Sequence, residues 1–374
     1  MSSPIRVAIV QPAVPQYRVP FFTRLITDAE KDGIHIDVFA GKTPTEIRAR
    51  GDASDSDFFH RLSTHELRIR RRSLFYKSTT PVLRGGYDLV ILEHGVRNME
   101  TYELLIRLGG QRIAFWGHGR TYTKSVSLQQ EWFKYWLGRR ATWFFGYTER
   151  GVDAVVEHGF PRNRTTVLNN TIDTAALRAD LAAISDDELR EFSRHHDLRG
   201  HTALYLGGID TDKRIPFLLE SALAAHELCS DFRLLIAGNG SDRALVEEFV
   251  AENSWASYLG ALHGRDKALA LRVAQALSIP GKIGLVAVDS MVAGTPIFTT
   301  KFPHHAPEFE YLTDGITAVV TKDDVDSYAA ELIALLSDRP RQKAMSDRCQ
   351  TESERYTLDA MVCNFLAGVN SALR

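Results

Sequence analysis

Short apolar runs rich in Val, Ile and Phe recur along the first 170 residues and alternate with longer stretches of helical period. The runs are RVAIVQPA, IHIDVFAG, YDLVILEHG, RIAFWGHG, ATWFFGYT and TTVLNN. Strands that are apolar on both faces and alternate with helices are typical of a parallel sheet that is covered on both sides. The pattern therefore predicts a doubly wound α/β domain over residues 1–175.

A polar, acid-rich stretch interrupts this rhythm, and SDDELREFSRHHDLRG within it has the pattern of an exposed helix capped by Ser185 or Asp186. We interpret residues 176–200 as a linker with a helix. A second series of runs follows: TALYLGG, FRLLIAGNG, SYLGAL, AQALSIPG and TPIFTT. It predicts a second domain of the same class over residues 201–351, and we expect a C-terminal helix at about 352–374 to pack back on the first domain.

Composition narrows the class of protein. The 374 residues are 44% hydrophobic and 25% charged, as in ordinary globular proteins, and the net charge of −2 gives no reason to expect a nucleic-acid partner. The three cysteines form no CxxC pair, which disfavours a zinc site or a disulfide framework. With no apolar run long enough for a signal peptide or a membrane span, we expect a cytoplasmic protein.

Glycines gather where the strands of the second domain end, at Gly207 and Gly208, at Gly238, and at Gly281 and Gly284. Ligands of doubly wound domains bind outside the carboxyl ends of the strands. A glycine-flanked turn that enters a helix also presents unpaired N–H groups at the positive end of the helix dipole, which suits a phosphate.

Two sets of charged residues near these turns are consistent with a nucleotide diphosphate. Asp289 lies one helical turn beyond the last glycine, where a carboxylate accepts hydrogen bonds from a ribose diol; the alternative is a partly exposed helix acid with no ligand. Lys213 and Arg214 precede another helix and are placed to clamp a diphosphate; the alternative is a solvated pair.

The order LGG, DKR, LLESA, LLIAGNG, YLGAL, PGKIGLVAVDSMVAGTP and HHAPEFEYLTDG resembles the C-terminal half of GT-B glycosyltransferases of family GT4. FWGHG and VLNNTID resemble first-domain signatures of the same family. The resemblance implies two Rossmann-like domains that face a central cleft. It also implies retaining, hexosyltransferase-type transfer from a nucleotide-diphosphate sugar to a glycan, glycolipid or small-molecule acceptor, without a metal or another cofactor.

The resemblance also implies roles for individual residues. Asp289 becomes the ribose-binding acid, Lys213 the diphosphate lysine with Arg214 beside it, and His118 the histidine that faces the donor sugar. These three basic residues are the expected catalytic groups. The donor-binding residues are then Gly207, Gly208, Gly238, Gly281, Lys282, Ile283, Gly284, Leu285, Asp289 and Glu308.

Three positions depart from the family's pattern. Gly281 stands where the first of two glutamates is expected, Asp289 replaces the second, and Gly208 replaces an arginine. The family's first glutamate commonly contacts donor hydroxyls, so a non-catalytic homologue that binds nucleotide sugars or glycans is an alternative.

Two enzyme classes are further alternatives. The GNG sequence indicates an NAD-dependent Rossmann enzyme, although Arg243 occupies the position of the third glycine. The acid pairs Asp210 with Asp212 and Asp55 with Asp57 resemble the metal ligands of single-domain GT-A enzymes; we interpret the first pair as turn residues.

Two basic and aromatic segments of the first domain predict peripheral contact with an anionic membrane, at the inner face of the plasma membrane, if the acceptor is lipid-linked. RIRRRSLFYK, residues 68–77, carries five cations and no acid, and EWFKYWLGRRATWFF has the composition of an interfacial helix. The alternatives are a solvated face for the first segment and a helix packed on a strand for the second.

Overall fold

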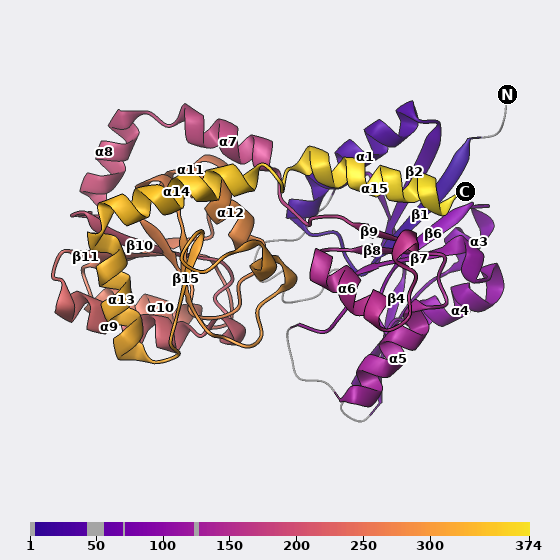
Figure 1. Ribbon diagram of the computed structural model, residues 1–374, viewed down its shortest axis with the longest axis horizontal. Coiled ribbons are helices and arrows are strands. Elements are labelled where there is room, and N and C mark those ends of the chain that lie inside the picture. Colours follow the sequence, from indigo (N-terminus) through magenta and orange to yellow (C-terminus); the bar gives the residue numbers. More distant parts are fainter. Residues whose placement is uncertain (1–3, 43–55, 70–71, 123–126) are drawn as a thin grey trace. The chain divides into compact units, whose positions relative to one another are not determined.

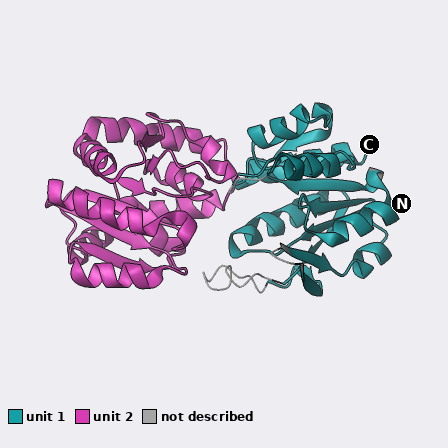
Figure 2. Ribbon diagram, turned by 90° about the horizontal axis from the view of Figure 1, so that it is seen from below, with its two compact units in different colours: residues 1–48, 52–170, 358–374 teal, residues 49–51, 171–357 magenta. Residues whose placement is uncertain are grey.

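The computed structural model describes residues 4–42, 56–69, 72–122 and 127–374, which divide into two units (Figures 1 and 2). The first unit contains the described residues up to 170 together with 358–374, and the second contains residues 171–357. Both units are built on parallel sheets flanked by helices.

In the first unit the main-sheet strands lie in the order β3-β2-β1-β6-β7-β8-β9, and every neighbouring pair is parallel. The chain runs outward in one direction from β1 and in the other from β6, so the strand order reverses between these two. The strands are β1 (Ile5–Gln11), β2 (Ile34–Ala40), β3 (Phe59–Arg61), β6 (Leu89–Glu93), β7 (Ile113–Gly117), β8 (Trp143–Gly146) and β9 (Thr165–Val167).

Helices cover both faces of this sheet because successive strand residues point to opposite sides. Ile9 and Ile91 belong to one apolar layer, and Val10 and Leu92 belong to the other. The helices and 3₁₀ turns are η1 (Gln16–Arg18), α1 (Val19–Lys31), α3 (Thr80–Arg84), α4 (Met99–Leu108), η2 (Gly110–Arg112), α5 (Leu128–Gly138), α6 (Glu149–Glu157), η3 (Arg162–Arg164) and α15 (Leu358–Ala372).

The last helix, α15, lies beside α1 (Figure 1) and closes one apolar layer of the first unit. Phe365 stacks on Phe145 with ring centroids 4.7 Å apart and meets Trp116 edge-on at 5.2 Å. Gly368 has no room for a Cβ, which would lie 2.4 Å from the Phe145 ring. The chain end is therefore part of the first unit's core.

A hairpin of β4 (Thr64–Ile69) and β5 (Arg72–Lys77) follows β3 and changes the interpretation of the basic segment 68–77. Arg68 is exposed and pairs with Glu66, but Lys77 is buried and its ammonium lies 2.5 Å from Glu100 on α4. Arg70 and Arg71 lie outside the described residues. The expectation that Lys77 joins an exposed basic patch is wrong, because this lysine neutralises a buried acid.

The second unit has the strand order β12-β11-β10-β13-β14-β15, again parallel throughout, and the order reverses between β10 and β13. Its strands are β10 (His201–Leu206), β11 (Phe232–Ala237), β12 (Ala256–Gly260), β13 (Ala276–Ser278), β14 (Ile297–Thr300) and β15 (Ala318–Thr321). Its helices and turns are α7 (Thr174–Ala183), α8 (Asp186–His195), η4 (Thr211–Lys213), α9 (Ile215–Leu228), α10 (Arg243–Glu252), α11 (Gly264–Val273), α12 (Val286–Ala293), η5 (Pro307–Tyr311), α13 (Val325–Ser337) and α14 (Arg339–Ser353).

The segment predicted as a linker forms α7 and α8, which cluster with the second unit and contact α11. The expected cap of α8 is confirmed: Ser185 accepts from the Glu188 N–H, and Glu188 reaches back to the Ser185 N–H in a capping box. Arg265 on α11 then binds both carboxylate oxygens of Glu188 at 2.7 and 2.8 Å.

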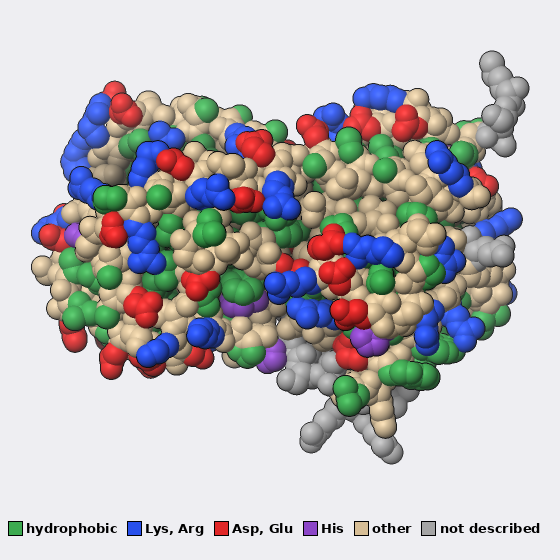
Figure 3. Space-filling view, viewed as in Figure 1, with side chains coloured by type: hydrophobic (Ala, Val, Ile, Leu, Met, Phe, Trp, Pro, Cys, Tyr) green, Lys and Arg blue, Asp and Glu red, His purple; other side chains and the backbone are tan. Residues whose placement is uncertain are grey.

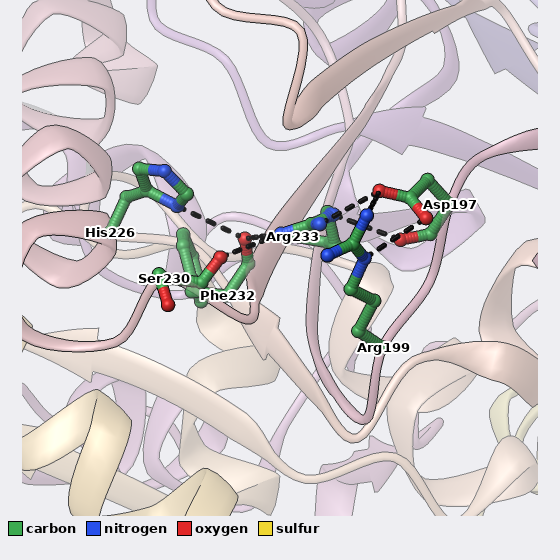
Figure 4. Close-up of polar contacts among 6 residues, drawn as sticks. All are labelled: Asp197, Arg199, His226, Ser230, Phe232 and Arg233. Carbon is green, nitrogen blue, oxygen red and sulfur yellow. Dashed lines mark hydrogen bonds and ion pairs between the residues drawn. The ribbon is translucent and has the colours of Figure 1, made fainter.

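Buried Arg233, at the start of β11, holds the turn between α8 and β10 (Figure 4). Its guanidinium donates to the carbonyl of Asp197 at 2.9 Å and to its carboxylate at 2.8 Å, and also to the carbonyls of Ser230 and Phe232. Asp197 has a φ of +48°, and this arginine supports that turn. Arg199 also binds the Asp197 carboxylate, at 2.8 Å, so two arginines hold the entry into the second sheet.

Cations and acids intermix over the face of the protein seen in Figure 3, in keeping with the net charge of −2. Within the described residues, none of the helices is long and apolar enough to cross a membrane.

Candidate donor-binding site of the second unit

The loops that follow β10 and β13 meet where the strand order of the second unit reverses. Lys213 on the β10 side donates from its ammonium to the carbonyl of Lys282 on the β13 side, at 2.6 Å. Lys282 returns two contacts to Asp212, from its N–H to the carbonyl at 3.1 Å and from its ammonium to the carboxylate at 2.9 Å. Two predicted site residues, Lys213 and Lys282, are therefore brought together where the strand order reverses.

Gly281 is required by this close approach. A Cβ at this position would lie 2.5 Å from the carbonyl carbon and oxygen of Lys213, closer than two non-bonded atoms can come. A side chain at residue 281 and the observed position of the Lys213 backbone exclude each other. The structure thus gives a physical reason for the glycine that departs from the family's pattern.

The turn into α12 presents backbone donors. The N–H of Ile283 is bound by Nδ1 of His305 at 3.2 Å, whereas the N–H groups of Gly284 and Leu285 make no hydrogen bond within the residues that the structure describes. These groups stand at the start of an eight-residue helix, where the dipole favours an anion. A Cβ on Gly284 would lie 3.9 Å from the carboxylate of buried Glu308, so this acid borders the same turn.

His305 supports the turn as a neutral imidazole. Its ring is buried, stacks on Phe309 at 3.8 Å, and accepts from Ile283 through Nδ1. Burial, with a smaller contribution from the Lys213 ammonium, lowers the pKa of His305 to about 4. The histidine therefore accepts a hydrogen bond at neutral pH, which a protonated ring could not do through Nδ1.

Arg214 is directed away from Lys213. Its backbone is left-handed, with φ +58° and ψ +47°, and its guanidinium pairs with Asp323 at 2.6 Å. The same group donates to the carbonyl of Pro280 at 3.3 Å and to the Thr300 hydroxyl at 3.1 Å. These contacts join the ends of β10, β13 and β14.

Asp289 is buried on α12 and forms an ion pair with Lys267 on α11, at 2.8 Å. The carboxylate raises the pKa of Lys267, which keeps the lysine charged. Sequence reasoning did not identify Lys267, because 22 residues separate the two partners and only the packing of α11 on α12 brings them together.

Gly207 and Gly238 allow the loops after β10 and β11 to touch. Their φ angles are +152° and +150°, and a Cβ on Gly238 would lie 1.8 Å from the carbonyl oxygen of Gly207. Gly240 in turn packs against the carbonyl of Ile209. The glycines of the GNG sequence therefore serve close backbone packing beside the β10 loop, and Gly208 continues that loop.

His118 belongs to the first unit and follows β7. It is exposed, and its ring lies against Tyr147 with centroids 4.6 Å apart. Gly119 and Gly151 bring the chain after β7 onto the start of α6, since a Cβ on Gly119 would meet the Gly151 carbonyl at 1.8 Å.

The predicted acid pairs have separate places. Asp210 precedes the short turn η4 and Asp212 lies within it, in agreement with their interpretation as turn residues. Asp55 lies outside the described residues. Among the described residues, there is no group of three or more His, Cys, Asp or Glu side chains that could hold a metal ion.

Residues 200–338 match the family described as Glycosyl transferases group 1. Phosphatidyl-myo-inositol mannosyltransferase of Mycolicibacterium smegmatis is 28% identical over 183 residues, which are 47% of this chain and 46% of the relative. The protein of the same name from Mycobacterium leprae is 29% identical over 37% of each chain. The matched stretches thus span less than half of these curated relatives.

Solved structures extend the similarity over nearly the whole chain. Anabaena Alr3699/HepE in complex with UDP and glucose has a TM-score of 0.68 at 13% identity, with 98% of this chain and all of that chain covered. A glycosyltransferase from Rickettsia africae has a TM-score of 0.71 at 11% identity, with 99% of both chains covered. At such identities the similarity establishes the fold.

Proposed function

We propose that the chain is a group 1 glycosyl transferase with the family's domain in its second unit, and that it is a retaining enzyme that uses a nucleotide-diphosphate sugar. The observation that carries this proposal is the meeting of the β10 and β13 loops, where Lys213, Lys282 and the unpaired N–H groups of Gly284 and Leu285 converge. Cations and oriented amides of this kind stabilise a leaving diphosphate.

In this proposal Lys213 is the catalytic cation, and Lys282 and the N–H groups of Gly284 and Leu285 bind the diphosphate and the sugar. Asp289 accepts from the ribose diol, and Glu308 from a sugar hydroxyl. Gly207, Gly208, Gly238 and Gly281 give the backbone its close approach. His118 lies on the first unit, and its role toward the donor sugar stays a prediction from the resemblance. Arg214, which binds Asp323, becomes a positioning residue.

The proposed reaction exchanges one bond at the anomeric carbon. The acceptor oxygen forms a bond to that carbon, the bond to the diphosphate breaks, and a diphosphate oxygen takes the acceptor proton. Similarity to structures that contain UDP supports a nucleotide donor, and similarity to mannosyltransferases of phosphatidyl-myo-inositol supports a lipid-linked or polyol acceptor. The proposed cations perform the role that a divalent ion has in GT-A enzymes.

A thermal-shift screen of UDP-, GDP-, ADP- and dTDP-sugars tests the proposal, because a ligand that binds only the native state raises its stability. We expect one nucleotide series to stabilise the protein. Turnover of that donor separates an enzyme from a nucleotide-sugar-binding protein, and NMR of the product's anomeric configuration tests retention. Activity that survives EDTA agrees with the proposal; activity lost to EDTA and restored by Mn²⁺ contradicts it.

A further inference from the structure

Two hydrogen bonds meet on the peptide that joins Lys282 to Ile283. Its carbonyl, on Lys282, accepts from the ammonium of Lys213 at 2.6 Å. Its N–H, on Ile283, donates to Nδ1 of His305 at 3.2 Å. The carbonyl and the N–H of a trans peptide lie in one plane and point in opposite directions, so the orientation of this peptide sets both bonds together. A change at His305 is therefore transmitted to the ammonium of Lys213.

The ring of His305 is itself held in place by two aromatic side chains. It stacks on Phe309 of η5 with ring centroids 3.8 Å apart, and it meets Phe302 edge-on at 5.5 Å. Only 7% of the histidine is exposed, so water has little access to Nδ1 as an alternative partner. The direction of Nδ1 toward the N–H of Ile283 is therefore fixed by packing.

The next peptide, between Ile283 and Gly284, is held in the same way. The N–H of Ala306 donates to the carbonyl of Ile283 at 2.8 Å. The N–H of Gly284 lies on the other edge of this peptide, so it is directed away from Ala306. The Ile283 side chain is buried in the core of the second unit, which leaves the residue little freedom to turn. One short segment, His305 with Ala306, thus orients two successive peptides of the donor-binding turn.

A lysine side chain needs such a guide because it is long and flexible. Its ammonium ends a flexible four-carbon stem and carries three donors, so the backbone of Lys213 alone does not set the position of the charge. The carbonyl of Lys282 selects one position, on the loop that also carries the N–H groups of Gly284 and Leu285. Hydrogen bonds that share a peptide also polarise one another, so the bond to His305 strengthens the Lys282 carbonyl as an acceptor.

We propose that His305 is a positioning residue of the transfer reaction: its Nδ1 orients the 282–283 peptide so that the Lys282 carbonyl holds the ammonium of Lys213 for the leaving diphosphate. The histidine acts through the backbone and does not need to touch the donor. The inference rests on the proposed function in naming the leaving diphosphate. The link from His305 to Lys213 rests on the two printed hydrogen bonds and the geometry of the peptide.

Substitutions at His305 separate its acceptor from its ring. His305→Asn keeps an acceptor atom where Nδ1 is attached but removes the ring. His305→Phe keeps an aromatic ring against Phe309 but has no acceptor. His305→Leu has the branched shape of Asn without its acceptor, and it takes the place of the Phe variant if thermal melting shows that the Phe variant does not fold. His195→Asn, at the exposed end of α8, is the matched control and should behave like the parent.

Competitive acetylation of the full chain, followed by mass spectrometry, measures the contact of Lys213 without any nucleotide. Exposed Lys343 is the internal reference. In His305→Phe the relative rate at Lys213 should rise by about fivefold, within the range of one hydrogen bond, because the ammonium is less firmly held. In His305→Asn the rate should stay close to that of the parent.

Release of UDP from UDP-glucose and of GDP from GDP-mannose measures the consequence for the reaction. For the donor that is turned over, His305→Phe should lower kcat by about tenfold or more with a smaller change in KM, because a displaced catalytic group loses its alignment. His305→Asn should recover most of this loss. A purely structural role of the ring predicts the reverse order of the two variants.

Unchanged reactivity of Lys213 in His305→Phe and His305→Leu, or an Asn variant as impaired as the Phe variant, overturns the link between the two residues. Raised reactivity of Lys213 with unchanged kcat overturns the part of His305 in the reaction. If the parent releases no nucleotide and binds neither UDP nor GDP, the proposed function fails, while the acetylation rates still decide whether His305 holds Lys213.

Discussion

The two units share the order of the strands around the point where that order reverses. The residues at this edge differ between the units. In the second unit the edge between β10 and β13 is made of glycines, backbone N–H groups and two lysines. In the first unit β1 and β6 end side by side at Gln11 and Glu93, and the carboxylate of Glu93 accepts from the amide of Asn98. The same strand order therefore positions two different chemistries.

The proposed nucleotide donor accounts for the residues at the second unit's edge. Backbone N–H groups are donors fixed in direction and close to the helix axis, so they suit the several oxygens of a phosphate. A glycine-rich edge must also keep side chains out, and the contact of Gly281 with Lys213 shows how tightly this is done.

The largest effect is expected from Gly281→Glu, which restores the glutamate of the family's pattern. Because even a Cβ would lie 2.5 Å from the Lys213 backbone, the substitution should displace the lysine and lower the transfer rate by about 100-fold or more. Steady-state kinetics and thermal melting measure this, with Gly281→Ala expected to act in the same direction. A Glu variant as active as the parent would contradict the described contact of the two loops.

Lys213→Ala should reduce kcat by about 100-fold with a smaller change in KM, because leaving-group charge grows as the glycosidic bond breaks. Lys343→Ala, on the exposed face of α14, is the matched control and should retain the activity of the parent. A rise in KM without a fall in kcat would show that Lys213 binds the substrate and would contradict its proposed catalytic role.

The sequence predicts most of the fold because buried parallel strands appear in it as continuous apolar runs. All eleven runs contain or overlap a strand of the two main sheets. The runs gave no sign of β3, β4, β5 or β15, which are short or carry polar residues on an exposed face.

The site is harder to predict from the sequence than the fold, because residues that are neighbours in the sequence can direct their side chains to different places. Lys213 and Arg214 are neighbours, yet the left-handed backbone of Arg214 sends its guanidinium to Asp323. Lys267 is placed against Asp289 only by helix packing.

The pH dependence of stability compares His305 of the second unit with His94 of the first. Burial lowers the pKa of His305 to about 4 and that of His94 to about 3, from 6.5. Between these values and 6.5 the unfolded chain binds more protons than the folded one, so stability falls as the pH falls below 6.5. For His305 the full effect is about 3 kcal/mol.

Urea unfolding at pH 7 and pH 5 measures this loss in the parent and in His305→Gln. We expect the loss between the two pH values to be smaller in the variant. An unchanged pH dependence would show that His305 does not accept from Ile283 as a neutral ring.

Asp289→Ala should weaken nucleotide binding by about tenfold, because a charged acceptor for the ribose diol is removed. Lys267→Met keeps the carboxylate but removes its anchor, so a smaller loss of affinity is expected. Calorimetry on both variants distinguishes a role of Asp289 in nucleotide binding from a role in stability. If both variants are less stable but bind the nucleotide as the parent does, the ion pair is purely structural. The donor would then be bound by the backbone N–H groups and the lysines, without Asp289.

The smallest effect concerns the exposed apolar side chains of α5. Leu128, Trp132 and Phe133 are exposed there, at 89%, 60% and 37%, while Tyr135 and Leu137 are buried. The helix therefore combines a packed face with an apolar outer face, and Arg139 follows at its end. An anionic bilayer suits this combination of aromatic rings and cations.

Vesicle sedimentation at low salt tests this contact, with binding expected to fall at high salt because screening shortens the reach of the charges. Arg139→Gln should weaken binding about fivefold, since one cation near an anionic surface contributes about 1 kcal/mol. Trp132→Ser should weaken it at both salt concentrations, because burial of an apolar ring is not screened. Absence of the parent from anionic vesicles at low salt would leave α5 as a solvated helix and point to a water-soluble acceptor.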